Sequence, residues 1–155
     1  MIDKRINVRG IVFRDGKILA QQLTPGSDGH PRDWWCIPGG GKDELESLID
    51  CIKREMIEET GIVPEIGKLL FIQQFYDGKR ENLEFFFHIK NANDYEDIDL
   101  TKTSHGVEEV KQVGFINPAT SDELPLYPKF LQTIDIADYI KNDKPVFIFV
   151  EGLKN

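Results

Sequence analysis

The chain has 155 residues with a formal net charge of −8, and 40% of its residues are hydrophobic and 30% charged. That length suits one domain, residues 1–155, with enough chain to bury a hydrophobic core. The negative charge repels polyanions and argues against a nucleic-acid partner, whereas a small nucleotide accompanied by a divalent cation is not excluded. No apolar run approaches the roughly 18 residues of a membrane span, and the N-terminus has no apolar signal core, which predicts a cytoplasmic protein without a membrane partner.

The first elements in chain order are a predicted β-hairpin and a long loop. Residues 7–13 and 17–23 are rich in apolar side chains and flank Asp15-Gly16, a dipeptide typical of hairpin turns. Residues 24–33 contain two prolines and two glycines, which predicts a surface loop near the entrance of a ligand site.

A helix is predicted after the glycines at 39–41. Asp43 and Glu46 form a D-x-x-E pattern typical of a helix N-terminus, and Gly61, followed closely by Pro64, indicates the C-terminal cap. The apolar residues of this segment recur at helical spacing beside an acidic face. They are Leu45, Leu48, Ile49, Ile52 and Met56.

The second half predicts another hairpin, residues 66–76 and 83–90 around the turn 77–80, with Phe85 to Phe87 in a strand buried on both faces. A polar loop, a strand, a helix and a short last strand are expected to follow. Their ranges are 91–104, 110–116, 129–139 and 146–150. Strands around a central helix, with another helix later, predict an α+β sandwich with a mixed sheet.

Glu55, Glu58 and Glu59 occupy positions i, i+3 and i+4 and therefore share one face of the predicted helix. Like charges at this spacing repel, and a bound cation would relieve the repulsion. Carboxylate oxygens are the ligands that Mg²⁺ and Mn²⁺ prefer, often together with substrate phosphates. Arg54 lies four residues before Glu58 and is expected to orient a carboxylate rather than react. A solvated acidic face is the alternative, but it does not explain the spacing.

Residues 40–62 place one glycine, four acids, one arginine and a second glycine at fixed intervals. The positions are Gly40, Glu46, Arg54, Glu55, Glu58, Glu59 and Gly61. This pattern resembles the Nudix box at every defining position, and the chain is similar to Nudix hydrolases. Residues 35–39 (WCIPG) and 124–131 (LPLYPKFL) resemble the segments before the box and near the end of many family members.

The resemblance implies a Nudix-type α/β/α sandwich and cleavage of a pyrophosphate linkage in a nucleoside diphosphate joined to a moiety X. A free nucleotide, a nucleotide sugar and an ADP-ribose-like compound all remain candidates. The implied cofactor is Mg²⁺, for which Mn²⁺ could substitute. The implied metal ligands are Glu55, Glu58, Glu59 and the carbonyl of Gly40, and the general base is one of these glutamates in some members and a loop glutamate in others.

Further site candidates lie outside the box. Glu109 borders a predicted strand, where family members often place another catalytic or metal-binding acid, whereas Glu108 is the weaker candidate of the pair. Among the aromatic residues, Trp34 and Tyr76 are expected to stack on the base or ribose, although Trp35 and Tyr127 could also do so and core packing explains most of these residues equally well. Arg9 and Arg32 are the chosen candidates for a distant phosphate, with Arg80 as another, although a surface charge is the alternative. Glu46 is expected to support the helix N-terminus.

Two other functional classes remain open. A Nudix-like module that binds or senses a nucleotide without cleaving it would not need the full set of acids. A diphosphate isomerase of related fold would need a catalytic cysteine and metal-binding histidines, and Cys36 and Cys51 do not supply that arrangement. The substrate depends on loops 24–33 and 91–104, whose shapes the sequence does not define, and the oligomeric state, including a homodimer, is open.

Overall fold

The computed structural model describes residues 1–104, 106–120 and 124–153. The longest helix is α1 (Leu48–Thr60), and two shorter helices follow, α2 (Gly106–Glu109) and α3 (Ile136–Lys141). Single turns of 3₁₀-helix span Ala92–Tyr95, Leu100–Lys102, Pro118–Thr120 and Lys129–Gln132. The strands are β1 (Asp3–Ile11), β2 (Phe13–Arg14), β3 (Lys17–Leu23), β4 (Trp35–Cys36), β5 (Gly39–Gly41), β6 (Ile66–Tyr76), β7 (Arg80–Ile89), β8 (Val110–Ile116), β9 (Leu126–Tyr127) and β10 (Phe147–Glu151).

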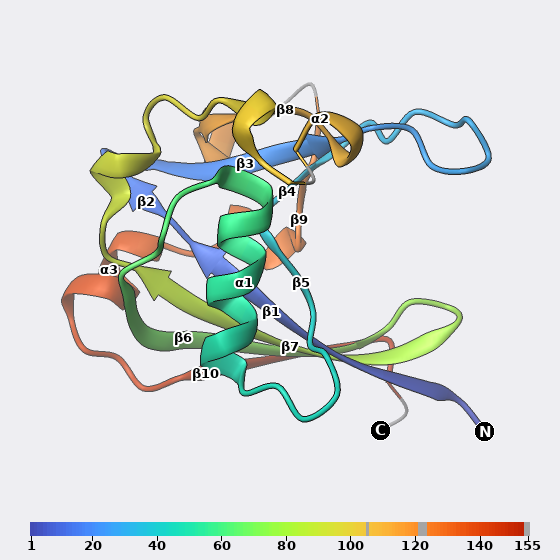
Figure 1. Cartoon of the computed structure of the whole chain (residues 1–155). Helices are drawn as coiled ribbons and strands as arrows, with labels where there is room; N and C mark the ends of the chain where they lie inside the picture. Colours follow the sequence, from blue (N-terminus) through green and yellow to red (C-terminus); the bar gives the residue numbers. More distant parts are fainter. Residues whose placement is uncertain (105, 121–123, 154–155) are drawn as a thin grey trace.

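The strands form two sheets that meet along β1 to β3 (Figure 1). The first sheet has the order β10-β6-β7-β1-β5 and is mixed, because β1 runs parallel to β7 and β10 parallel to β6, while the other pairs are antiparallel. The second sheet has the order β2-β3-β4-β9, and β8 pairs with β3.

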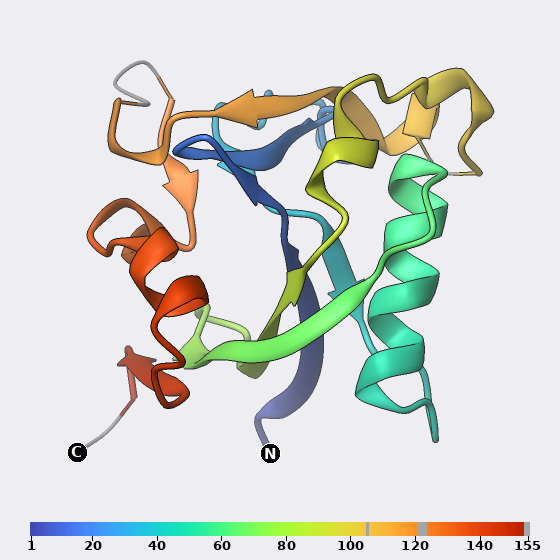
Figure 2. The ribbon, with the colours of Figure 1, turned by 90° about the vertical axis from the view of Figure 1, so that its left-hand side faces the viewer.

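Helices cover the strands from two sides, as Figure 2 shows with α1 on one side and α3 on the other. Cys51, Ile52 and Met56 of α1 are fully buried in one hydrophobic core together with Val8 of β1. Gly10 of β1 permits this close approach, because a Cβ atom there would lie 2.9 Å from the Met56 sulfur. The predicted α+β sandwich with a mixed sheet is therefore confirmed.

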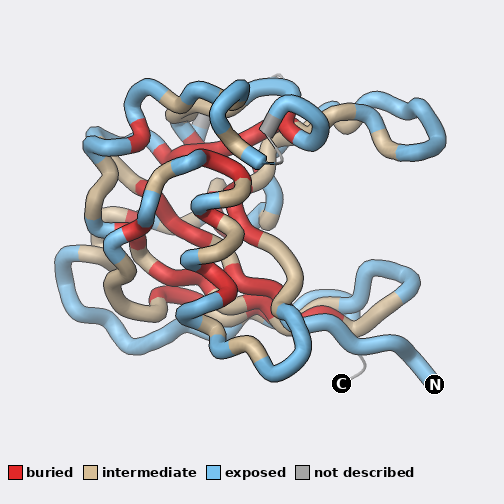
Figure 3. Tube along the Cα trace, in the orientation of Figure 1, coloured by how far each residue is buried: buried red, intermediate tan, exposed pale blue. Residues whose placement is uncertain are grey.

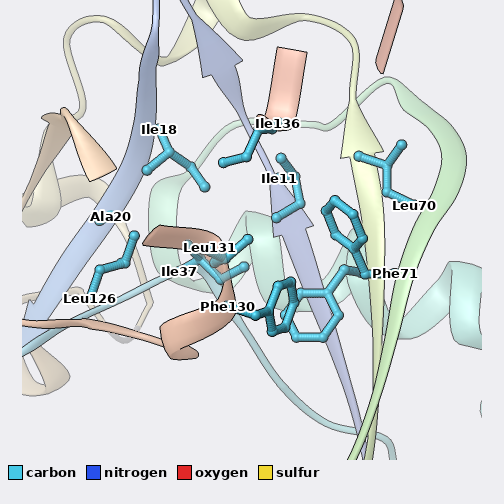
Figure 4. Close-up of a cluster of buried hydrophobic side chains, with 11 residues drawn as sticks. Ile11, Ile18, Ala20, Ile37, Leu70, Phe71, Leu126, Phe130, Leu131 and Ile136 are labelled. Carbon is cyan, nitrogen blue, oxygen red and sulfur yellow. The ribbon is translucent and has the colours of Figure 1, made fainter. Parts of the chain in front are cut away.

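The second core lies on the opposite side of the first sheet, against α3 and the 3₁₀ turn at 129–132 (Figure 4). Phe71, Phe86 and Phe130 pack edge to face there, with ring centroids 5.3–6.4 Å apart. Phe87 belongs to the first core and Phe86 to the second, so the expectation that this strand is buried on both faces is confirmed. Figure 3 shows the buried residues gathered in the central strands.

The predicted first hairpin is right at its turn and wrong in its extent. Only Phe13–Arg14 pairs antiparallel with Lys17–Leu23 around Asp15-Gly16, whereas β1 pairs with β5 and β7 in the other sheet. The chain leaves the first sheet after Ile11, which still pairs with β7, and enters the second sheet at Phe13.

The central helix begins later than the D-x-x-E pattern predicts. Ser47 is the N-cap, and its hydroxyl accepts a hydrogen bond from the Asp50 N–H at 3.0 Å. Leu45 has a positive φ of 60° and is 98% exposed, so it does not join the apolar stripe. The end is as predicted, because Gly61 adopts φ 74° and donates its N–H to the Ile57 carbonyl at 2.9 Å.

The helix predicted at 129–139 is interrupted. The chain forms a 3₁₀ turn at Lys129–Gln132 and restarts as α3 after Asp135, whose carboxylate accepts the N–H of Asp138. The strands expected near 110–116 and 146–150 are present as β8 and β10. Because β10 pairs with β6, the C-terminal segment belongs to the first sheet.

Candidate active site

A cleft of about 1320 Å³ opens between the two sheets on the side of α1 that carries the acids. The loop between β3 and β4 and the hairpin between β6 and β7 project on this side of the molecule (Figure 1). All ten residues that the sequence predicted for the site line this one cleft. They are Arg9, Arg32, Trp34, Gly40, Arg54, Glu55, Glu58, Glu59, Tyr76 and Glu109.

Arg54 organises the helix side of the cleft. Its Nε and Nη2 donate to the two carboxylate oxygens of Glu46 at 2.8 and 2.9 Å, and Nη2 also donates to the Gly41 carbonyl at 3.1 Å. Its Nη1 donates to Glu55 at 3.0 Å and to Glu58 at 3.3 Å. Arg54 therefore contacts two of the cleft acids, and its bond to the Gly41 carbonyl ties the helix to the glycine turn. The orienting role of Arg54 stays a prediction.

Glu46 does more than support a helix N-terminus. One of its oxygens accepts the Asp43 N–H at 3.0 Å, as the D-x-x-E pattern suggests, although both residues precede the helix. The hydrogen bonds from Arg54 lower the pKa of Glu46 to about 2. Glu46 is therefore a charged anchor for Arg54 behind the cleft.

Glu59 is the most buried of the three acids on α1, with 8% of its surface exposed. Its Oε2 accepts the Gly39 N–H at 2.9 Å, and its Oε1 accepts a hydrogen bond from the Gln21 side chain at 3.3 Å. Burial raises the pKa of Glu59 to about 8, since these bonds only partly offset the loss of water around the carboxylate.

Glu55 lies directly against the glycine turn. A Cβ atom on Gly40 would be 2.6 Å from Oε1 of Glu55, so glycine is required for this contact. Burial raises the pKa of Glu55 and Arg54 lowers it, with burial the larger effect. We call Glu55, Glu58 and Glu59 the acid wall of the cleft.

The acid wall has the ligand types of a divalent-cation site, but its side chains are not yet placed to hold an ion. Among the described residues, no group of three or more His, Cys, Asp or Glu side chains is already placed to hold a metal ion. The reason is visible in the contacts, because Arg54 draws Glu55 and Glu58 toward itself while the Gly39 N–H and Gln21 hold Glu59. The oxygen donors, the raised pKa values of Glu55 and Glu59 and the Glu55 carboxylate set directly against Gly40 fit a hard cation, which Glu55, Glu58, Glu59 and the Gly40 carbonyl could hold.

Arg9 lies on the floor of the cleft, and its guanidinium group already contacts other protein groups. Its Nη1 donates to the Gly39 carbonyl at 3.2 Å and to the Ile37 carbonyl at 3.4 Å, and its Nε lies 3.5 Å from Glu84. These contacts hold the turn that presents Gly39 to Glu59. The predicted phosphate contact of Arg9 stays a prediction.

The loop side of the cleft carries the predicted aromatic and basic residues. Trp34 and Tyr127 pack edge to face, with ring centroids 6.3 Å apart. Tyr76 is 41% exposed at the hairpin on the opposite side, and its hydroxyl donates to the Gly78 carbonyl. Arg32 and Trp34 bring the loop before β4 to the cleft, whereas Arg80 is not among the lining residues.

Glu109 is the last residue of α2 and lines the cleft, while Glu108 does not. The backbone carbonyl of Glu109 accepts the Thr24 N–H at 3.0 Å, and that of Glu108 accepts the Thr24 hydroxyl at 2.8 Å. These bonds attach α2 to the loop after β3. The preference for Glu109 over Glu108 is thus consistent with its position, and its catalytic role stays a prediction.

Several residues that line the cleft were not predicted from the sequence, among them Arg5, Gln21, Gln73 and Glu84. Gln21 contacts Glu59, and Arg5 packs against Gly41. A signal existed for two of them, because Glu84 interrupts an otherwise apolar strand and Gln73 lies within the strand predicted at 66–76. Assigning them to a site required the pairing of β1, β6 and β7.

Comparison with known proteins places the chain in a family. It matches the model of the NUDIX domain over residues 3–131. Over 62 residues, 39% of this chain, it is 32% identical to the 8-oxo-dGTP diphosphatase of Buchnera aphidicola subsp. Acyrthosiphon pisum (strain APS), and that match spans 50% of the diphosphatase. The chain therefore belongs to the NUDIX domain family.

Solved structures show the same fold. The MutT NUDIX hydrolase from Burkholderia pseudomallei matches with a TM-score of 0.61 and 22% identity, over 79% of this chain and 88% of that one. The MutT protein from Methanosarcina mazei Go1 matches with a TM-score of 0.67 and 19% identity, over 93% of this chain and 98% of that one. Within the described residues, no helix has the length and apolar character needed to cross a membrane.

Proposed function

We propose that this protein is a divalent-metal-dependent pyrophosphohydrolase that cleaves the pyrophosphate linkage of a nucleoside diphosphate joined to a moiety X. One observation carries the proposal: Glu55, Glu58 and Glu59 line the same cleft beside the glycine turn at 39–41. Membership of the NUDIX domain family and the likeness to an 8-oxo-dGTP diphosphatase support it.

The metal ligands in this proposal are the acid wall and the Gly40 carbonyl, with Mg²⁺ as the expected ion and Mn²⁺ as a substitute. The bound ion would neutralise charge on the phosphates and on the leaving oxygen. Arg54 keeps Glu55 and Glu58 oriented, and it is itself fixed by Glu46 and the Gly41 carbonyl.

A general base is needed to take a proton from the attacking water. Glu55 and Glu58 are candidates on the helix, and Glu109 is the candidate from α2. Glu59 is the least suitable of the acid wall, because both of its oxygens already accept hydrogen bonds from protein groups. Its role in the proposal is therefore that of a ligand.

The substrate is proposed to be a small nucleotide derivative. A net charge of −8 and an acid-lined cleft oppose a long polyanion, whereas a short phosphate chain is neutralised by one or a few cations. Trp34, Tyr127 and Tyr76 offer aromatic surface at the cleft for a base or ribose. Arg9 and Arg32 are the proposed contacts for the distant phosphate.

The test is hydrolysis of a panel of nucleoside triphosphates, ADP-ribose, dinucleoside polyphosphates and nucleotide sugars in ¹⁸O-labelled water with Mg²⁺. We expect at least one of these compounds to be cleaved and the label to appear on a product phosphate. Label on a sugar carbon, or cleavage of capped RNA alone, would overturn the proposal. Metal-dependent nucleotide binding without any turnover would identify a binding module instead.

A further inference from the structure

A row of polar side chains crosses the floor of the cleft on three neighbouring strands. Asn7 of β1 lies opposite Glu84 of β7, and Glu84 lies opposite Gln73 of β6. Residues paired in this way carry their side chains on the same face of a sheet, with Cβ atoms about 5 Å apart. Glu84 and Gln73 line the cleft, so this face of the sheet is the one turned toward it. We call these three residues the polar row.

The three residues of the polar row are buried, but their hydrogen-bonding capacity is only partly used. Asn7, Gln73 and Glu84 are 4%, 6% and 6% exposed. Glu84 receives a hydrogen bond from the Asn7 amide at 3.4 Å and has the Arg9 Nε at 3.5 Å, and each carboxylate oxygen can accept more than one bond. Within the described part of the chain, the side-chain amide of Gln73 has no hydrogen-bond partner. The buried side-chain atoms that lack a partner among the described residues are Gln21 Oε1 and Tyr95 OH, so the polar end of Gln73 instead opens on the cleft that this residue lines, where a ligand can bond to it.

The order of donors and acceptors in the polar row defines the ligand that fits it. The Glu84 carboxylate presents two acceptors side by side, and the Gln73 amide on the next strand offers a donor. The Gln73 amide also carries an acceptor oxygen, so the carboxylate is the more selective group: its complement has two adjacent donors, and an acceptor next to them can pair with the Gln73 N–H. Among the common bases only guanine has this edge, with O6, N1–H and the N2 amino group in sequence. Adenine and cytosine offer an amino group beside a ring acceptor, and uracil offers one N–H between two carbonyls.

We propose that Glu84 and Gln73 read the Watson–Crick edge of a guanine base, a proposal that rests on the proposed nucleotide substrate and names its base. Phe75, two residues beyond Gln73 on the same face of β6, also lines the cleft and offers an apolar surface to the ring. Arg9 connects this floor to the acid wall, because it contacts both Glu84 and the carbonyl of Gly39, whose N–H binds Glu59. A nucleotide held by its base on the polar row thus has its phosphates within the same cleft as the acid wall.

The test compares the binding of GMP, IMP and AMP to the full chain in metal-free buffer, followed by NMR of the glutamine side-chain amides. The three ligands carry the same phosphate, so its contribution to the affinity cancels, and IMP differs from GMP only by the missing N2 amino group. We expect GMP to bind about 10-fold more tightly than IMP or AMP and to shift the Gln73 amide signals.

Three variants complete the experiment. Glu84→Gln should remove the preference for GMP. Gln73→Met should weaken GMP binding while leaving the Arg9–Glu84 pair in place, which keeps the test valid if Glu84→Gln disturbs folding. Glu81→Gln is the matched control, because Glu81 lies on the same strand but on the opposite face, outside the cleft lining, and should keep the preference.

Equal affinities for the three monophosphates, no binding of GMP, or a GMP preference that survives in Glu84→Gln would each overturn the inference. If Glu84→Gln lowered turnover equally for every base and left the binding preference intact, Glu84 would act only by holding Arg9 against the glycine turn, which also contradicts base reading. If no pyrophosphate were hydrolysed but the Glu84-dependent GMP preference persisted, the proposed function would fail while this inference stood.

Discussion

The acid wall on α1 and the polar row on the sheet floor hold their charges in opposite ways. On the helix, one arginine bonds to Glu46, Glu55 and Glu58, so the acids form a network with a shared cation. On the sheet, Glu84 has one arginine and one amide nearby at longer distances, and Gln73 beside it has no partner among the described residues. The helix side is thus arranged to keep negative charges together, whereas the floor keeps hydrogen-bonding capacity open toward the cleft.

This difference separates two kinds of expected effect. Changes in the acid wall should alter turnover and metal binding for every substrate, and changes in the polar row should alter the choice of base. The following predictions concern the helix side and its surroundings: first the effects on activity, from the larger to the smaller, and then those on stability.

Replacing Glu58 by Gln should lower the rate of hydrolysis by about 100-fold while the fold is kept, because a ligand charge is lost at constant volume. Glu58 is half-buried on the cleft side of α1 and contributes nothing to the buried apolar face. Steady-state kinetics at saturating Mg²⁺ would measure the loss, with Glu44→Gln on the exposed segment before the helix as the control. Near wild-type turnover would remove Glu58 from the metal site.

Ca²⁺ in place of Mg²⁺ should support little activity, since its larger radius and looser geometry place phosphates poorly.

Glu109→Gln should lower activity about 10-fold and weaken its dependence on Mg²⁺, whereas Glu108→Gln should change neither. The reason is position, because Glu109 lines the cleft and Glu108 does not. A titration of activity against Mg²⁺ for the two variants side by side makes the comparison. If the two variants had the same activity and the same Mg²⁺ dependence, neither residue would act in catalysis.

Arg54→Lys should destabilise the protein by about 1–2 kcal/mol, because an ammonium cannot reproduce the two parallel hydrogen bonds to Glu46. Urea denaturation would give the free energy of unfolding. Lys53→Ala, next in sequence and exposed, is the control and should change stability little. A loss no larger in Arg54→Lys than in the control would show that the network does not stabilise the fold.

The last expected effect is a pH dependence of stability in metal-free protein. The pKa of Glu59 is about 8 in the folded protein and 4.5 as a free side chain, so the folded state holds a proton that the unfolded state releases. Its contribution to stability is complete below about pH 4.5 and is lost as the pH rises toward 8. Thermal unfolding between pH 5 and 9 in EDTA should show this decline, and Glu59→Gln should flatten it. Mg²⁺ should restore stability at pH 8, and an unchanged slope in the variant would contradict the assignment.

The two regions also differ in how much of them the sequence could reveal. The acid wall was predictable because Glu55, Glu58 and Glu59 are close in sequence and the helical repeat alone places them together. The polar row was not predictable, because it depends on the parallel pairing of β1 with β7, which brings together residues 77 positions apart in the sequence. The hairpin predicted at 7–13 and 17–23 was too long for the same reason, because β1 pairs with β7 in the first sheet.

Two predicted helix boundaries were wrong, each for a local reason. Asp43 and Glu46 do form the expected backbone contact, but the chain turns at Leu45 with a positive φ and Ser47 takes the capping position. In the C-terminal segment, the 3₁₀ turn at 129–132 ends and Asp135 caps a new helix. The spacing of apolar residues in the sequence does not reveal this interruption. The ten predicted residues line one cleft despite these errors, because most of the elements that carry them begin and end near the predicted positions.

The most direct test of the acid wall as a metal site is the binding of Mn²⁺ to the full chain, measured by electron paramagnetic resonance without any substrate. The wild-type protein should bind Mn²⁺, and Glu58→Gln and Glu59→Gln should each weaken binding by at least about 10-fold, while Glu44→Gln should not. Mg²⁺ should displace the bound Mn²⁺. Equal Mn²⁺ binding by the wild type and both acid-wall variants would contradict the proposed metal site.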